Sequence, residues 1–178
     1  LYAQLLMDSK DPEERTWVEA RGIQLLKGIP PGEAEDLRVE LLNGRYMVAE
    51  DTAERYRLRL TEAGDVDHAV ESFDSIIEEL RRIITRTSKS FESSTRKMNR
   101  SSSSRSAPRR ERLNQQQQVL RRAEYLLAWS LAYRGWLKHD ENSVEEAEGL
   151  FGKLLDLKAG EMDPDHVSLD RRSEDAVS

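Results

Sequence analysis

The strongest constraint on the fold is a long pattern of apolar residues spaced three and four positions apart. The pattern runs from Val66 to Ile84. This spacing places its members on one stripe of an α-helix, with charged residues on the opposite face. Burying each large apolar side chain stabilises the folded state by about 1.5–3 kcal/mol. A stripe of this length therefore requires a partner surface. The stripe consists of Val66, Ala69, Val70, Phe73, Ile76, Ile77, Leu80, Ile83 and Ile84.

The preceding segment supplies a candidate partner for this stripe. From Leu42 to Ala63 apolar residues recur at a spacing close to 3.5, which predicts a helix that starts after the break at Pro30-Pro31-Gly32. A sustained coiled coil is the less favoured interpretation, because the seam spans about three heptads. Gly64 then ends it.

Similar patterns predict helices in both remaining parts of the chain. One runs from Leu113 to Lys138, and a second runs from Val144 to about Leu157 after a Ser143/Glu146 pair with capping-box spacing. Near the amino end, Asp11-Pro12-Glu13-Glu14 is typical of a helix start, and residues 1–7 are interpreted as the end of a truncated helix. We therefore expect an all-α protein.

Charged residues are distributed unevenly along the chain. The formal net charge is −6, yet residues 81–112 contain eleven Lys and Arg against two Glu, which leaves −15 on the remainder. Residues 87–110 are rich in Ser and Arg and contain one aromatic residue, so they offer little apolar surface to offset their conformational entropy. We expect helical hairpins over 1–86, a disordered insert over 87–110, a C-terminal hairpin over 111–158 and a flexible tail over 159–178.

A helical-hairpin unit recurs in the sequence. Ala20, Ala69 and Ala147 occupy equivalent positions in three predicted second helices, at intervals of 49 and 78 residues. Removing an insert of about 24 residues from the longer interval leaves a unit of roughly 50 residues, which is typical of a solenoid. An irregular helical bundle is the alternative fold.

The recurring unit resembles the tetratricopeptide repeat. Gly64-Asp65-x-x-x-Ala69-x-x-x-Phe73 is similar to the turn and second helix of that repeat, and Leu131-Ala132 with Ala147 and Phe151 is similar to a second copy. The resemblance implies helical hairpins stacked as an α-solenoid, with a concave face that binds a peptide or another protein. It also implies that Tyr133 and Trp136 are packing aromatics. The residues that it implies pack the repeats together are Gly64, Ala69, Phe73, Leu131, Ala132, Ala147 and Phe151.

The sequence contains no pattern that favours catalysis. Phosphate-binding loops, dinucleotide-binding turns and nucleophile elbows are absent, there is no cysteine, and the three histidines lie far apart. Asp163, Asp165 and His166 are interpreted as polar tail rather than as a metal site. We therefore expect no catalytic residue, no cofactor, no metal and no enzymatic activity.

These observations favour a protein-interaction scaffold with a protein or peptide partner of unknown identity. Trp129, Tyr133 and Trp136 form a cluster that could anchor a peptide, although helix packing is the favoured role. Nucleic-acid binding through the insert is disfavoured because Phe91 is its single aromatic residue. A helical accessory domain of a larger enzyme is a further alternative.

The sequence does not define a cellular compartment. No run approaches the roughly 18 apolar residues needed to span a membrane. Because the first residue is Leu1 rather than methionine, we expect a fragment. A targeting segment upstream of it is therefore compatible with the sequence.

Overall fold

The computed structural model describes residues 12–28, 34–60, 63–100 and 107–155. Within these ranges every regular element is an α-helix, which confirms the all-α prediction. The predicted truncated helix over 1–7 and the predicted tail over 159–178 lie outside the described residues. The helices are α2 (Pro12–Lys27), α3 (Glu35–Arg57), α4 (Ala63–Arg100), α5 (Ala107–Lys138) and α6 (Glu141–Leu154).

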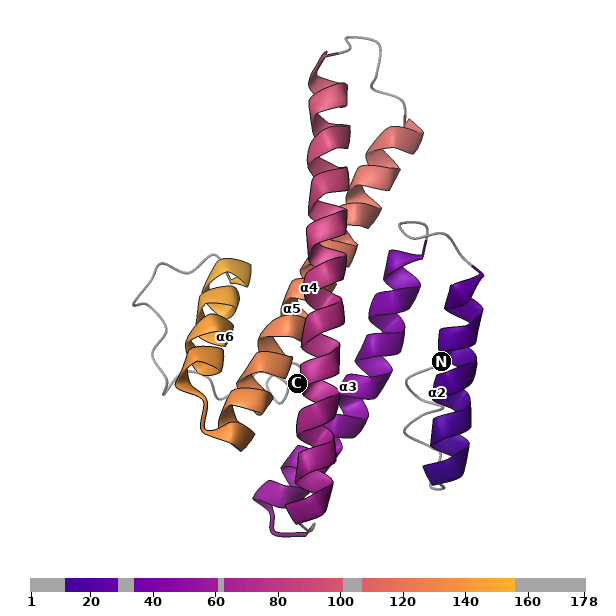
Figure 1. Cartoon of the computed structure of the whole chain (residues 1–178). Helices are drawn as coiled ribbons and strands as arrows, with labels where there is room; N and C mark the ends of the chain where they lie inside the picture. Colours follow the sequence, from indigo (N-terminus) through magenta and orange to yellow (C-terminus); the bar gives the residue numbers. More distant parts are fainter. Residues whose placement is uncertain (1–11, 29–33, 61–62, 101–106, 156–178) are drawn as a thin grey trace, which may run out of the picture.

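The helices pack around α4 and α5, which are antiparallel and form the centre of the molecule (Figure 1). Helix α3 packs against α4 and also contacts α5, whereas α6 packs against α5 on the other side. Helix α2 lies beside α3 at the edge. This arrangement of packed helices is compatible with a helical repeat. No helix in the described ranges is long and apolar enough to cross a membrane.

The core is built on the apolar stripe of α4. Phe73, Ile76, Leu80 and Ile83 have no solvent-exposed surface. The side chains that cover the stripe come from two neighbouring helices, as its length requires. They include Tyr46, Ala49 and Ala53 of α3 and Leu126, Leu127 and Leu131 of α5.

The structure corrects the expectation of a disordered insert over 87–110. Residues 87–100 continue α4 and residues 107–110 belong to α5, while residues 101–106 lie outside the described part. Thr87 is buried, and Phe91 and Val119 are half-buried, so the two helices bury more surface than the composition of this segment suggests. This end of the α4–α5 hairpin projects beyond α3 and α6 (Figure 1).

Hydrogen bonds explain how a serine-rich segment continues a helix. The Ser93 hydroxyl donates to the carbonyl of Ser90 at 2.9 Å, and the Gln116 amide of α5 donates to the Ser90 hydroxyl at 2.9 Å. Hydroxyl groups that compete for the backbone in an isolated chain are therefore satisfied within the helix or by its neighbour.

A tight turn joins α5 to α6. His139 adopts a left-handed conformation with φ 54°, and the Asp140 N–H donates to the carbonyl of Gly135 at 2.9 Å. A Cβ atom at Gly135 would lie 2.8 Å from Val144 Cγ2, so glycine allows the first turn of α6 to approach α5 closely. The expected capping box does not form, because α6 begins at Glu141 and no side chain caps it.

Candidate functional site

Aromatic side chains line the side of α5 that faces away from the buried Leu127. Tyr125, Trp129 and Trp136 are spaced four and seven residues apart, which places them on one stripe of the helix. Tyr125 is 55% exposed and Trp136 is 40% exposed. The aromatic strip, as we call this surface, consists of Tyr125, Trp129, Tyr133 and Trp136 of α5 together with Tyr56 of α3.

Ring contacts connect the strip along its length and to neighbouring helices. The Trp129 ring lies 6.4 Å from the Tyr125 ring and 6.1 Å from the Tyr133 ring, measured between centroids. Trp129 also meets Phe151 of α6 edge-to-face at 5.1 Å. At the other end, Tyr56 and Trp136 meet edge-to-face at 6.3 Å. These contacts restrict the rotamers of side chains that remain partly open to solvent.

Two carboxylates border the strip on its α3 side. The Tyr133 hydroxyl donates to Glu54 Oε1 at 2.9 Å, and the Tyr46 hydroxyl donates to Glu50 Oε1 at 2.8 Å. Burial, followed by the adjacent carboxylates, raises the pKa of both tyrosines above its ordinary value. The phenols therefore remain protonated donors at neutral pH and hold both carboxylates beside the aromatic rings.

The residues predicted to pack the repeats lie in different environments. Ala69, Phe73, Leu131 and Ala147 are buried in one core cluster. Ala132 and Phe151 are partly buried against that cluster. Gly64 is exposed in the first turn of α4, and a Cβ atom there would meet nothing within 4 Å, so this glycine makes no close helix contact.

The two aromatics named as possible partner contacts also differ. Tyr133 is half-buried and stacks on Phe73, whereas Trp136 points outward. Sequence reasoning missed Tyr56, Glu50 and Glu54, which come from another helix and carry no spacing signal relative to α5. The spacing of the α5 aromatics was a sufficient signal for the rest of the strip.

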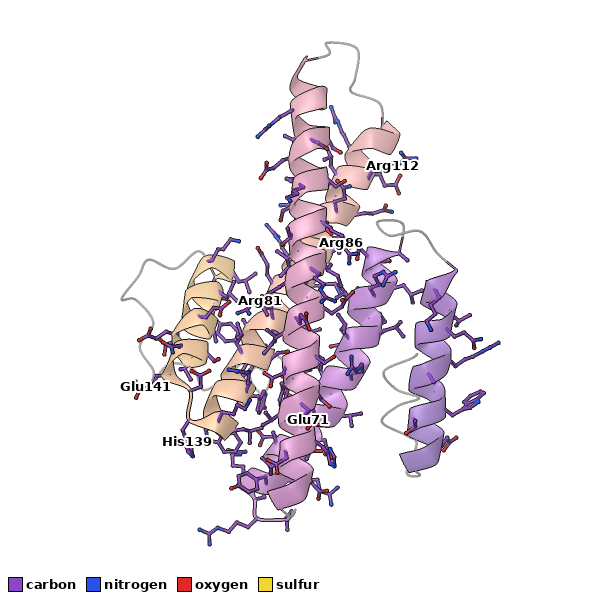
Figure 2. All side chains as sticks on the ribbon, viewed as in Figure 1. Glu71, Arg81, Arg86, Arg112, His139 and Glu141 are labelled. Atoms are coloured by element: carbon purple, nitrogen blue, oxygen red, sulfur yellow. The ribbon has the colours of Figure 1, made fainter. Side chains whose placement is uncertain are left out.

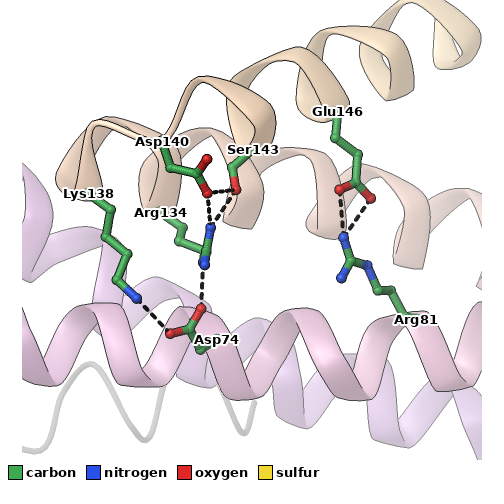
Figure 3. Close-up of polar contacts among 7 residues, drawn as sticks. All are labelled: Asp74, Arg81, Arg134, Lys138, Asp140, Ser143 and Glu146. Carbon is green, nitrogen blue, oxygen red and sulfur yellow. Dashed lines mark hydrogen bonds and ion pairs between the residues drawn. The ribbon is translucent and has the colours of Figure 1, made fainter.

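A second polar cluster joins α4, α5 and α6 (Figure 3). Arg134 of α5 contacts Asp74 of α4 and Asp140 at the start of α6, and the Ser143 hydroxyl donates to Asp140 at 2.7 Å. Lys138 also donates to Asp74, at 3.2 Å. Because these charges satisfy one another, we interpret the cluster as a latch that fixes the position of α6.

The latch changes the acidity of its carboxyl groups. Burial tends to raise the pKa of Asp74, but hydrogen bonds from Arg134 and Lys138 outweigh burial and lower that pKa. Hydrogen bonds from Ser143 and Arg134 lower the pKa of Asp140. Both carboxylates are therefore stabilised in their charged form.

A groove lies beside the latch, between α4 and α6. Its volume is about 710 Å³, with Ile77 and Leu131 among its apolar lining residues. Arg81 bridges the two helices, with its Nη2 atom 2.6 Å from Glu146 Oε2 (Figure 3). The charged side chains that line this groove form ion pairs, either with one another or with neighbouring residues.

The described residues contain no group of three or more His, Cys, Asp or Glu placed to hold a metal ion. Comparisons of the chain with protein-family models, with curated proteins and with solved structures find no match.

Proposed function

We propose that this chain is a non-catalytic protein-interaction module built as a tetratricopeptide-like helical repeat. In this proposal α3–α4 and α5–α6 are successive hairpins of the repeat. The contact between their first helices, α3 and α5, supports this pairing. The aromatic strip occupies these two first helices, and stacked hairpins form extended binding surfaces of this kind.

The observation that carries the proposal is the exposure of three aromatic side chains on one surface. Tyr56, Tyr125 and Trp136 are between 40% and 55% exposed. Tyr and Trp are enriched among the residues that dominate protein-binding energy. Their ring contacts reduce the entropy lost when a partner binds, which favours recognition over a purely structural role.

The border of the strip indicates the chemistry of the partner segment. Glu50 and Glu54 lie beside the aromatic rings, and because Arg57 pairs with Glu54 at 2.8 Å, Glu50 is the carboxylate without an ion pair in the described residues. Lysine and arginine interact favourably both with carboxylates and with the faces of aromatic rings. We therefore infer that the partner is a peptide segment that combines basic residues with at least one large apolar side chain.

A selection from a displayed random-peptide library tests this function. We expect enrichment of peptides with Lys or Arg beside an apolar residue, and loss of their binding to the Tyr125→Ala/Trp136→Ala variant. The matched control is Leu58→Ala/Leu155→Ala, which removes two exposed apolar side chains outside the strip. An absence of enriched peptides, or equal loss of binding in both variants, would contradict the proposal.

A further inference from the structure

The α4–α5 hairpin is strongly basic toward the end that projects beyond α3 and α6 (Figure 1). Residues 86–96 and 110–122 contain seven Arg and Lys against Glu92 and Glu111, a net charge of +5. We call these two stretches the basic hairpin end. Arg86 and Arg112 lie on its two helices (Figure 2). Its cations are Arg86, Lys89, Arg96, Arg110, Arg112, Arg121 and Arg122.

Ion pairs join helices in the packed body of the protein, and three cations of the basic hairpin end are also paired, namely Arg86, Arg96 and Arg122. In the body, Arg81 pairs with Glu146, and Arg134 pairs with Asp74 and Asp140. Within the described ranges, four exposed cations of the basic hairpin end have no ion-pair partner. Like charges left together repel one another and attract an anionic partner. These four residues are Lys89, Arg110, Arg112 and Arg121.

The neighbouring side chains indicate which anionic partner fits. None of the large apolar side chains that are exposed in the described ranges belongs to the basic hairpin end. Protein interfaces depend on apolar or aromatic anchors, and helices on membrane surfaces insert an apolar face. Hydroxyl and amide groups instead accompany these cations, and such groups contact phosphate and sugar in nucleic acids. They are Ser90, Ser93, Gln115, Gln117 and Gln118, all exposed.

We propose that the basic hairpin end binds the phosphate backbone of double-stranded nucleic acid without sequence preference. A duplex fits better than a single strand, because single-strand platforms stack bases on aromatic rings and Phe91 is half-buried. The surface is separate from the aromatic strip, so this activity does not depend on the proposed peptide binding.

Acidic residues limit the binding surface on its α3 side. A hollow of about 800 Å³ at the base of the hairpin end is lined by Arg112, Arg122 and Gln118, and also by Glu35 and Asp36 of α3. Carboxylates repel phosphate, so the duplex contacts the part of the hairpin end that projects beyond α3 (Figure 1). Lys89, Arg110 and Arg112 are the cations that we choose to test this contact.

Fluorescence anisotropy with a labelled 20-base-pair DNA duplex of arbitrary sequence tests the proposal. With about four phosphates contacted, the logarithm of the association constant should fall with the logarithm of KCl concentration at a slope of about −3.6. The Lys89→Ala/Arg110→Ala/Arg112→Ala variant should reduce the magnitude of this slope by about 2.7 and weaken binding at 20 mM KCl at least tenfold.

A matched variant distinguishes binding by this surface from binding that depends on the overall charge of the protein. Lys27→Ala/Arg55→Ala/Arg59→Ala removes three exposed cations outside the basic hairpin end and should retain the wild-type affinity and slope. The Arg110→Lys/Arg112→Lys variant should also bind, because its charge is unchanged. Circular dichroism should show equal helix content in all variants.

Three results would overturn the proposal. The first is an absence of duplex binding at 20 mM KCl and tens of micromolar protein. The second is an equal loss of affinity in the control variant, which would mean that overall charge rather than this surface binds DNA. The third is stronger binding to anionic lipid vesicles than to the duplex, which would assign the surface to a membrane.

Discussion

The ring of Tyr133 lies parallel to the ring of Phe73, with an interplanar angle of 2° and centroids 5.8 Å apart. Phe73 is fully buried in the stripe of α4, whereas Tyr133 lies at the inner edge of the aromatic strip. This stacked pair connects the core to the candidate binding surface. A defect beneath Tyr133 should therefore affect both stability and binding.

Replacement of Phe73 by alanine should strongly destabilise the protein. The change removes a fully buried ring and leaves a cavity below Tyr133, which costs about 3–5 kcal/mol in the free energy of unfolding. Urea denaturation followed by circular dichroism measures this loss. Trp17→Ala removes an aromatic side chain that is 66% exposed and should change stability by less than about 0.5 kcal/mol.

Two glycines in the C-terminal hairpin should respond oppositely to alanine. Gly135→Ala places a Cβ atom against Val144 and should destabilise by about 1–3 kcal/mol. Gly149 lies within α6 with nothing within 4 Å of a Cβ atom, so Gly149→Ala should stabilise by about 0.5–1 kcal/mol. Thermal unfolding distinguishes the signs, and a Gly135→Ala variant as stable as the wild type or more stable would refute the close approach at Gly135.

The latch should make stability depend on acid pH. Because the folded pKa values of Asp74 and Asp140 are lowered, their contribution is present above the unfolded value of about 3.9 and is lost as pH falls through the folded values. Urea midpoints between pH 7 and pH 3 should show this loss. The Asp74→Asn/Asp140→Asn variant should be less stable at pH 7 and should lose less stability on acidification, so an identical decline in both proteins would exclude the latch.

A buried carboxylate at the start of α3 provides a further test. Glu35 is 8% exposed, lies 3.3 Å from Arg86 Nε, and makes no hydrogen bond through either carboxylate oxygen in the described part of the chain. Arg86→Met leaves this charge without that partner and should destabilise by about 1–3 kcal/mol. Adding Glu35→Met should restore stability to the wild-type level or above it, because an ion pair at a buried site contributes little net stability. If the double variant were less stable than both the wild type and Arg86→Met, groups other than Arg86 would compensate the charge of Glu35.

The sequence predicted helices correctly where buried residues recur with the period of an α-helix. The spacing of Val66, Phe73 and Leu80 predicted the stripe of α4, and that stripe is the centre of the core. The segment around Ser93 was misjudged because composition reports how little apolar surface a segment has, but not that a second helix lies against it. Packing between distant segments decided its structure.

The candidate site shows the same division between local and long-range information. The spacing of Tyr125, Trp129 and Trp136 in one helix is a local signal. The approach of Tyr56 and Glu54 depends on the packing of α3 against α5, which no local pattern specifies. The predicted Ser143/Glu146 capping box did not form because α6 begins at Glu141, which places Ser143 inside the helix, where its hydroxyl donates to Asp140.

The affinity of one selected peptide for the aromatic strip tests the central claim most directly. Fluorescence anisotropy of the labelled peptide should show at least tenfold weaker binding to Tyr125→Ala/Trp136→Ala than to the wild type, since aromatic anchors of this kind contribute about 2 kcal/mol or more. Leu58→Ala/Leu155→Ala should bind as the wild type does. Equal affinities for the strip variant and the wild type would show that the aromatic strip is not the binding surface.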